Sequence, residues 1–184
     1  MTRMIALLRG INVGAGNRIR MDALRRLFED AGFSGVETYI QSGNVLFSTD
    51  EPEASVRDTI SRILLEGAEI KTTAVLRSAE ELAAILTNCP FSSEEIEAAQ
   101  RDNAEGESFY VYLLPQAPAP ETLQKLASLP QESDRFAIVG RDVYLLLRQS
   151  VRNSKLAIKL QKLLPEATAR NWNTIRQLHQ RSNS

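Results

Sequence analysis

The polar residues best suited to chemistry lie in one loop near the start of the sequence, directly after a short apolar segment. Glycines free the backbone of this loop, which also carries four polar side chains: Arg9, Asn12, Asn17 and Arg18. Such a loop can turn backbone N–H groups, amides and guanidinium groups toward an anion. These residues predict contact with phosphate or nucleic acid; the alternative is a strained connection held by its own amides.

The glycine spacing in this loop matches neither standard phosphate-binding motif. A P-loop would require glycine at Ala15, and Gly10, Gly14 and Gly16 do not form the dinucleotide-binding fingerprint. Nucleotide binding by either standard mode is therefore disfavoured.

A second polar group, Gln41-Ser42-Gly43-Asn44, separates two predicted strands. A tight hairpin needs Gly43 for backbone reasons alone. In the functional interpretation, Gln41, Ser42 and Asn44 add polar groups beside the first loop. We expect parallel packing of the first and third strands to make the two loops neighbours.

A third polar group lies near the other end of the chain. It comprises Ser154 and Lys155 at one predicted helix start and a run at the next: Arg170, Asn171, Trp172 and Asn173. Ser154, and either Asn171 or Asn173, are suited to cap these helices, which is the structural interpretation. In the functional interpretation the helix N-termini form anion sites with Lys155 and Arg170. Trp172 is more typical of a core anchor than of a stacking platform.

The sequence contains no recognisable catalytic or metal-binding pattern. Cys89 is expected to be a small buried side chain, and His179 to be solvated. One cysteine and one histidine nearly exclude a zinc site. Acidic pairs stand at predicted helix starts, where carboxylates favour the helix dipole. We therefore predict no catalytic residue, no metal and no cofactor, and leave open whether the protein is an enzyme.

The second half of the chain carries aromatic residues at strand spacing. Tyr110 and Tyr112 share one face of their predicted strand, and Tyr144 is expected to share it from a neighbour. Base stacking on such a face is associated with a basic-glycine-aromatic signature that neither strand contains. Packing between two sheets, or a dimer contact, is the favoured interpretation.

The composition, 43% apolar and 24% charged residues, is that of a soluble globular protein. No apolar run reaches the ~20 residues that span a bilayer, and residues 1–8 lack a signal-peptide pattern. A single cysteine suits a reducing compartment, so we expect a cytoplasmic protein with no membrane partner. The net charge of −1 hides basic ends, residues 1–28 and 141–184, which form either one basic face or separate solvated faces.

Apolar periodicity places the polar groups on a repeated pattern of elements. Residues 3–8, 36–40, 44–48 and 70–76 predict strands, and two helices complete the order β-α-β-β-α-β. The order recurs with strands at 109–114, 136–139, 143–147 and 168–170. Asp50 is expected to cap the second helix, and Ser78 with Glu81 to form a capping box before a third.

The predicted fold class is therefore α+β, with two tandem ferredoxin-like sandwich subdomains that suggest a duplication. The predicted boundaries are 1–77 for the first subdomain, 78–107 for a helical linker and 108–184 for the second subdomain.

Several of these motifs resemble those of a bacterial family, domain of unknown function 1697. The similarity is carried by Ala6–Gly14 and Tyr39–Val45, with shorter matches at Asn88, Pro90 and Phe91, at Ser154–Leu156, at Thr168 and at Arg170–Thr174. The resemblance covers nearly the whole chain and implies a two-part α+β fold without an established activity. Ala15 and Gln149–Val151 replace positions where the family commonly has glycine, which weakens the case for close ligand approach at the second turn.

Together these features predict a protein that binds an anionic, phosphate-bearing ligand or a nucleic acid. Arg9, Arg18, Lys155 and Arg170 would neutralise phosphate, and neighbouring amides would orient it. Two other classes stay open. One is an enzyme acting on a small phosphorylated or acidic metabolite; the other is a protein–protein interaction module, for which a homodimer is one arrangement. The oligomeric state is not predicted.

Overall fold

The computed structural model describes all 184 residues, which form two four-stranded antiparallel sheets and seven helices. The chain divides into two compact units. Unit 1 comprises Met1–Ala83 and Gln177–Ser184, and unit 2 comprises Ala84–Arg176. The mixed α+β class is confirmed, while the boundaries at residues 77 and 107 stay predictions. No helix is both long and apolar enough to cross a membrane.

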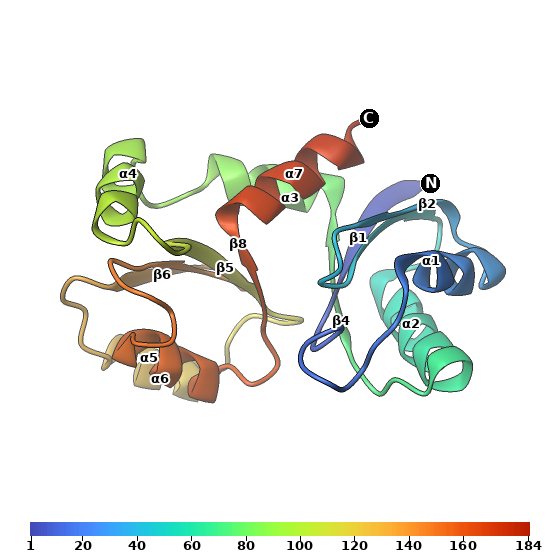
Figure 1. The fold of residues 1–184 in the computed structure, drawn as a ribbon, viewed down its shortest axis with the longest axis horizontal. Coiled ribbons are helices and arrows are strands. Elements are labelled where there is room, and N and C mark those ends of the chain that lie inside the picture. Colours follow the sequence, from blue (N-terminus) through green and yellow to red (C-terminus); the bar gives the residue numbers. More distant parts are fainter. The chain divides into compact units, whose positions relative to one another are not determined.

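Unit 1 is built on one sheet in the order β2-β3-β1-β4. Its elements follow the chain as β1 (Thr2–Leu8), α1 (Met21–Asp30), β2 (Ser34–Tyr39), β3 (Asn44–Thr49), α2 (Glu53–Ala68) and β4 (Ala74–Ser78). Figure 1 shows α1 and α2 covering one face of this sheet. Their apolar stripes meet alternate strand residues, and a three-ring cluster of Phe28, Phe33 and Phe47 lies in this core.

The strand directions in unit 1 differ from the expectation. β1 and β3 pair antiparallel, with Leu7 opposite Asn44, and not parallel. Antiparallel pairing places the end of β1 beside the start of β3. The two loops are therefore neighbours as expected, but for the opposite reason.

Two boundaries around α2 also differ. Asp50 does not cap this helix: the N-cap residue is Pro52, and Asp50 forms an ion pair with the N-terminal amine at 3.2 Å. Ile70 does not belong to a strand, because its N–H bonds the carbonyl of Leu64 and closes the helix behind a left-handed Glu69. β4 consequently begins only at Ala74.

Unit 2 has the sheet order β6-β7-β5-β8. Its sheet elements are β5 (Phe109–Leu113), α5 (Pro120–Ala127), β6 (Arg135–Val139), β7 (Asp142–Leu146), α6 (Lys155–Leu163) and β8 (Thr168–Asn171). Three more helices are α3 (Ala79–Thr87), α4 (Ser93–Asp102) and α7 (Trp172–Ser182); α3 and α7 each run across a boundary between the units. In Figure 1, α5 and α6 lie on one face of this sheet.

The tyrosines of unit 2 occupy both faces of its sheet. Tyr112 is buried in the core beneath α5 and α6, and Tyr110 packs against that core. Tyr144 pairs directly with Val111 in the antiparallel ladder and therefore lies on the other face, so the expected shared face was wrong. There its hydroxyl donates to the carbonyl of Ile85 at 2.7 Å, and Phe109 stacks beside its ring.

Candidate functional site

Asn12 ties the first loop to the hairpin between β2 and β3. Its Nδ2 donates to the carbonyl oxygens of Ile19, at 3.1 Å, and Gln41, at 2.9 Å, while its Oδ1 accepts the N–H of Ile19 at 2.9 Å. Both amide donors and the amide acceptor are thus engaged by backbone groups. Asn12 shapes the loop, and its side-chain amide has no free donor left for a ligand.

The same two segments approach closely at Gly43. The N–H of Leu8 donates to the carbonyl of Gly43 at 2.8 Å. A Cβ at position 43 would lie 2.9 Å from the Cβ of Leu8 and 3.2 Å from the Cβ of Ile11, and the residue has a φ of +87°. Glycine is needed here for both backbone conformation and space, as the hairpin interpretation required.

Asn44 and Ser42 belong to the same rigid turn. Asn44 is fully buried, and its Nδ2 donates to the Tyr39 carbonyl at 3.0 Å and to Ser42 Oγ at 2.9 Å. Two turn residues adopt left-handed conformations, Ile40 at φ +48° and Gly43 at +87°. A β-branched residue with positive φ is rare, so the turn holds Ile40 in a strained conformation.

A cavity of about 280 Å³ opens where the first loop leads into α1. It is lined by Asn12, Arg18, Ile19, Arg20, Met21 and Gln41. Three of the residues predicted from sequence, Asn12, Arg18 and Gln41, are therefore brought together. The structure adds Arg20 and Met21, which stand at the N-terminus of α1.

The N-cap residue of α1 provides no side-chain cap. Arg20 is the N-cap residue and cannot accept a hydrogen bond from the first turn. Asp22 Oδ1 accepts the N–H of Ala23 at 3.0 Å, whereas the N–H groups of Met21 and Asp22 have no partner within the protein. Unpaired N–H groups and the positive end of the helix dipole favour an anion at this position.

The charges around the cavity are unequal. Arg18 is exposed and donates to the Gly14 carbonyl at 2.7 Å, so its guanidinium has no acidic partner. Arg20 forms an ion pair with Asp22 at 3.2 Å, and its side chain is 86% exposed. The Asp22 carboxylate therefore offsets only the charge of Arg20, and the Arg18 charge leaves the cavity net positive.

Arg9 and Asn17 lie outside this cavity. Asn17 is exposed with a φ of +50°, a conformation that asparagine tolerates well, and its carbonyl accepts the N–H of Asn12. Arg9 lines a separate and larger cavity together with Lys71. The predicted first group is thus divided between two concave surfaces.

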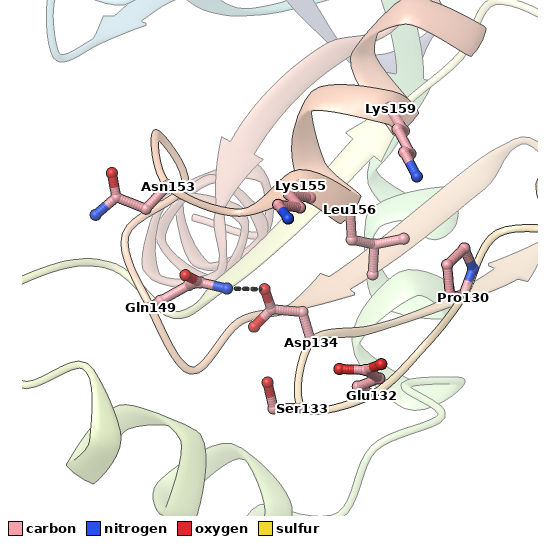
Figure 2. Close-up of a pocket in the computed structure, with 9 residues that line it drawn as sticks. All are labelled: Pro130, Glu132, Ser133, Asp134, Gln149, Asn153, Lys155, Leu156 and Lys159. Atoms are coloured by element: carbon pink, nitrogen blue, oxygen red, sulfur yellow. Dashed lines mark hydrogen bonds between the residues drawn. The ribbon is translucent and has the colours of Figure 1, made fainter.

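In unit 2, Lys155 lines a cavity of about 300 Å³ at the start of α6 (Figure 2), and Ser154 is its neighbour in the chain. Ser154 caps the helix as expected, accepting the N–H of Ala157 at 3.1 Å. The buried carboxylate of Asp134 accepts hydrogen bonds from Ser154 Oγ at 2.8 Å and Gln149 Nε2 at 2.6 Å. Asp134 therefore supplies a negative charge where the functional interpretation placed a ligand.

Most residues of the last predicted group, Arg170 to Asn173, have a structural role. Asn171 caps α7 by accepting the N–H of Thr174 at 2.8 Å, and the Trp172 ring lies 4.6 Å from that of Phe109. Arg170 is 9% exposed, its Nη1 donates to the Ala169 carbonyl, and burial lowers the pKa of its guanidinium to about 10. Asn173 alone in this group is exposed.

The one cysteine of the chain, Cys89, is half-buried. Burial raises the pKa of the Cys89 thiol, which donates weakly to the Phe91 carbonyl. No three His, Cys, Asp or Glu side chains are grouped to hold a metal ion.

Two residues that decide where an anion can bind were not predicted from the sequence. Arg20 stands two residues after Arg18 and directly before the predicted helix, a placement that could have indicated it. Asp134 gave no such signal, because a lone aspartate in a polar turn does not reveal a helix start 20 residues later.

Comparison with known proteins establishes the family. A search of curated proteins gave no match. Among solved structures, the chain is similar to the conserved bacterial protein SP0830 from Streptococcus pneumoniae, with 23% identity, a TM-score of 0.80 and coverage of 100% of this chain and 99% of that chain. At this identity the likeness shows the fold alone. A family model matches residues 1–144, and the chain therefore belongs to the family described as Protein of unknown function (DUF1697).

Proposed function

We propose that the protein binds a phosphate-bearing anion in the cavity between the first loop and the start of α1. The proposal rests on one observation: Arg18 and Arg20 flank an uncapped helix N-terminus inside a cavity of about 280 Å³. Backbone N–H groups and guanidinium groups are the two donors that proteins most often direct at phosphate.

The loop supports this assignment because it is already ordered. Asn12 holds both sides of the cavity, so binding an anion requires no folding of the loop. The cavity is small enough for one phosphate group with part of its substituent. We assign the site to unit 1 and not to the start of α6, because Asp134 would repel an anion there.

Nucleic acid is the polymeric form of such a ligand. We propose contact through its phosphates only, since Tyr112 is buried and Trp172 is packed against Phe109. This contact is expected to be independent of base sequence and sensitive to salt.

Fluorescence anisotropy of a labelled mixed-sequence single strand, titrated at two salt concentrations, tests the proposal. The double variant R18Q/R20Q should weaken binding and reduce the salt slope by about 0.7 for each lost phosphate contact. R25Q/R26Q removes the same charge from the exposed side of α1 and is the matched control. Equal losses in both variants would show a general charge effect and contradict the site.

We also propose that the two units are ferredoxin-like and arose by duplication. Two features support this: each has the element order β-α-β-β-α-β, and in each sheet the first strand lies between the third and the fourth. The single cysteine supports a cytoplasmic location.

A further inference from the structure

The largest cavity described in unit 1 has a volume of about 650 Å³ and lies apart from the proposed phosphate site. It is lined by Arg9, Gly10, Ser61, Leu65, Lys71, Thr72 and Thr73, none of which borders the cavity at α1. Its volume is within the range of small-molecule sites. We propose that it binds a small amphipathic anion, a phosphate or carboxylate that carries an apolar chain or ring.

Two cationic side chains of the cavity indicate that the ligand carries an anionic group. Arg9 directly follows β1, Lys71 lies between α2 and β4, and both side chains are exposed. Neither forms a hydrogen bond or an ion pair through its charged group. Other unit 1 cations, such as Arg57 and Arg62, are paired with carboxylates on their own helix. Two unpaired charges of one sign on one cavity favour a ligand of the opposite sign.

The α2 residues that line the cavity indicate that the ligand also carries an apolar group. Ser61 and Leu65 are one helical turn apart and therefore share a face of α2. Leu65 is 53% exposed although its neighbour Leu64 is fully buried, so a large apolar surface faces the cavity without a protein partner. The hydroxyl groups of Ser61 and Thr73 also belong to lining residues and can donate to an oxyanion, whereas the Thr72 hydroxyl is already donated to the Arg9 carbonyl.

The cavity is held in shape by contacts that do not use its cations. Thr72 Oγ1 donates to the Arg9 carbonyl at 2.6 Å and joins the two segments at the rim. Directly beside them, Leu8 pairs with Ala74 in the β1–β4 ladder. Arg9 and Lys71 are therefore positioned by the backbone, and their charged groups are available to a ligand.

Hexyl phosphate is the probe that carries both features, and inorganic phosphate and hexanol are its separate halves. Titration of the ¹⁵N-labelled protein should shift the amide signals of Ser61, Leu65, Thr72 and Thr73. We expect hexyl phosphate to bind at least about tenfold more tightly than either half. The variants K71Q and L65N should each weaken it by about tenfold, and R62Q on the same helix, outside the cavity, should leave it unchanged.

The outcomes separate this site from the phosphate site at α1. The proposal would be overturned if hexyl phosphate bound no more tightly than inorganic phosphate or than hexanol. It would also be overturned if hexyl phosphate did not bind at all. Shifts centred on Met21 and Asp22, lost in R18Q/R20Q, would also overturn it while supporting the proposed function. Thermal unfolding identifies a misfolded L65N, in which case K71Q alone decides.

Discussion

Asn12 and Gln41 are joined by a hydrogen bond of 2.9 Å from the Asn12 amide to the Gln41 carbonyl, across 29 positions of sequence. This bond links the first loop to the β2–β3 hairpin and forms one wall of the cavity at α1. The polar residues that resemble a binding motif in the sequence thus include some that build the site and others that can contact a ligand.

Replacing Asn12 should destabilise the protein. Asn12→Ala removes three hydrogen bonds, each worth about 1 kcal/mol, and places alanine at a φ of +56°. Asn12→Gly loses the same bonds but tolerates the conformation, so it should be the more stable variant by about 1 kcal/mol. Urea unfolding measures both values. Two variants with wild-type stability would show that the amide does not hold the loop.

Relieving strain at Ile40 should have the opposite effect. Its side chain is 49% exposed and its φ is +48°, so little burial is lost by substitution. Asparagine adopts this conformation readily, and Ile40→Asn should raise the free energy of unfolding by about 1 kcal/mol. Val36→Asn, on β2 at a residue that lacks a positive φ and packs against the unit 1 core, should be destabilising by comparison. If Ile40→Asn lowered the free energy of unfolding, the packing of the isoleucine side chain would stabilise the protein by more than the backbone strain destabilises it.

Removing the carboxylate beside the cavity should strengthen anion binding. Asp22 pairs with Arg20 and offsets its charge, so Asp22→Asn leaves both guanidinium groups to the ligand. We expect tighter binding of inorganic pyrophosphate, measured by calorimetry, with a loss of roughly 0.3–1 kcal/mol of stability at the helix start. Asp30→Asn, at the far end of α1, changes net charge equally and is the control. Weaker binding in Asp22→Asn would contradict the site.

Cys89 should react slowly in the folded protein. Burial raises the pKa of its thiol, so less thiolate is present at about pH 8 than in a free cysteine. Alkylation by iodoacetamide should be slower than that of a model thiol and should reach the model rate in concentrated urea. Faster alkylation of the folded protein would reveal an activated thiol and favour the enzyme interpretation.

Much of the fold was accessible from local sequence patterns. The hairpin at Gly43 and the capping box of Ser78 with Glu81 are present where their turn and cap residues predicted them. The sequence-based predictions were wrong where a residue's position depends on a pairing partner distant in the sequence. The face of Tyr144 is decided by its register opposite Val111, and no spacing within β7 reveals that register.

The candidate site was predictable only in part for the same reason. Polar residues at loops could be identified, but Asn12 and Arg18 have different roles, because one amide is consumed by backbone carbonyls and one guanidinium remains exposed. Backbone carbonyls engage both amide donors of Asn12, whereas Arg18 uses one guanidinium nitrogen on the Gly14 carbonyl and keeps other donors for a ligand. These contacts form only in the folded chain.

The most direct test of the anion site is an NMR titration of the ¹⁵N-labelled protein with inorganic phosphate. The unpaired N–H groups of Met21 and Asp22 should show the largest shifts, which R18Q/R20Q should abolish and R25Q/R26Q should preserve. Shifts of similar size at the starts of other helices, or no shift at Met21 and Asp22, would contradict the account.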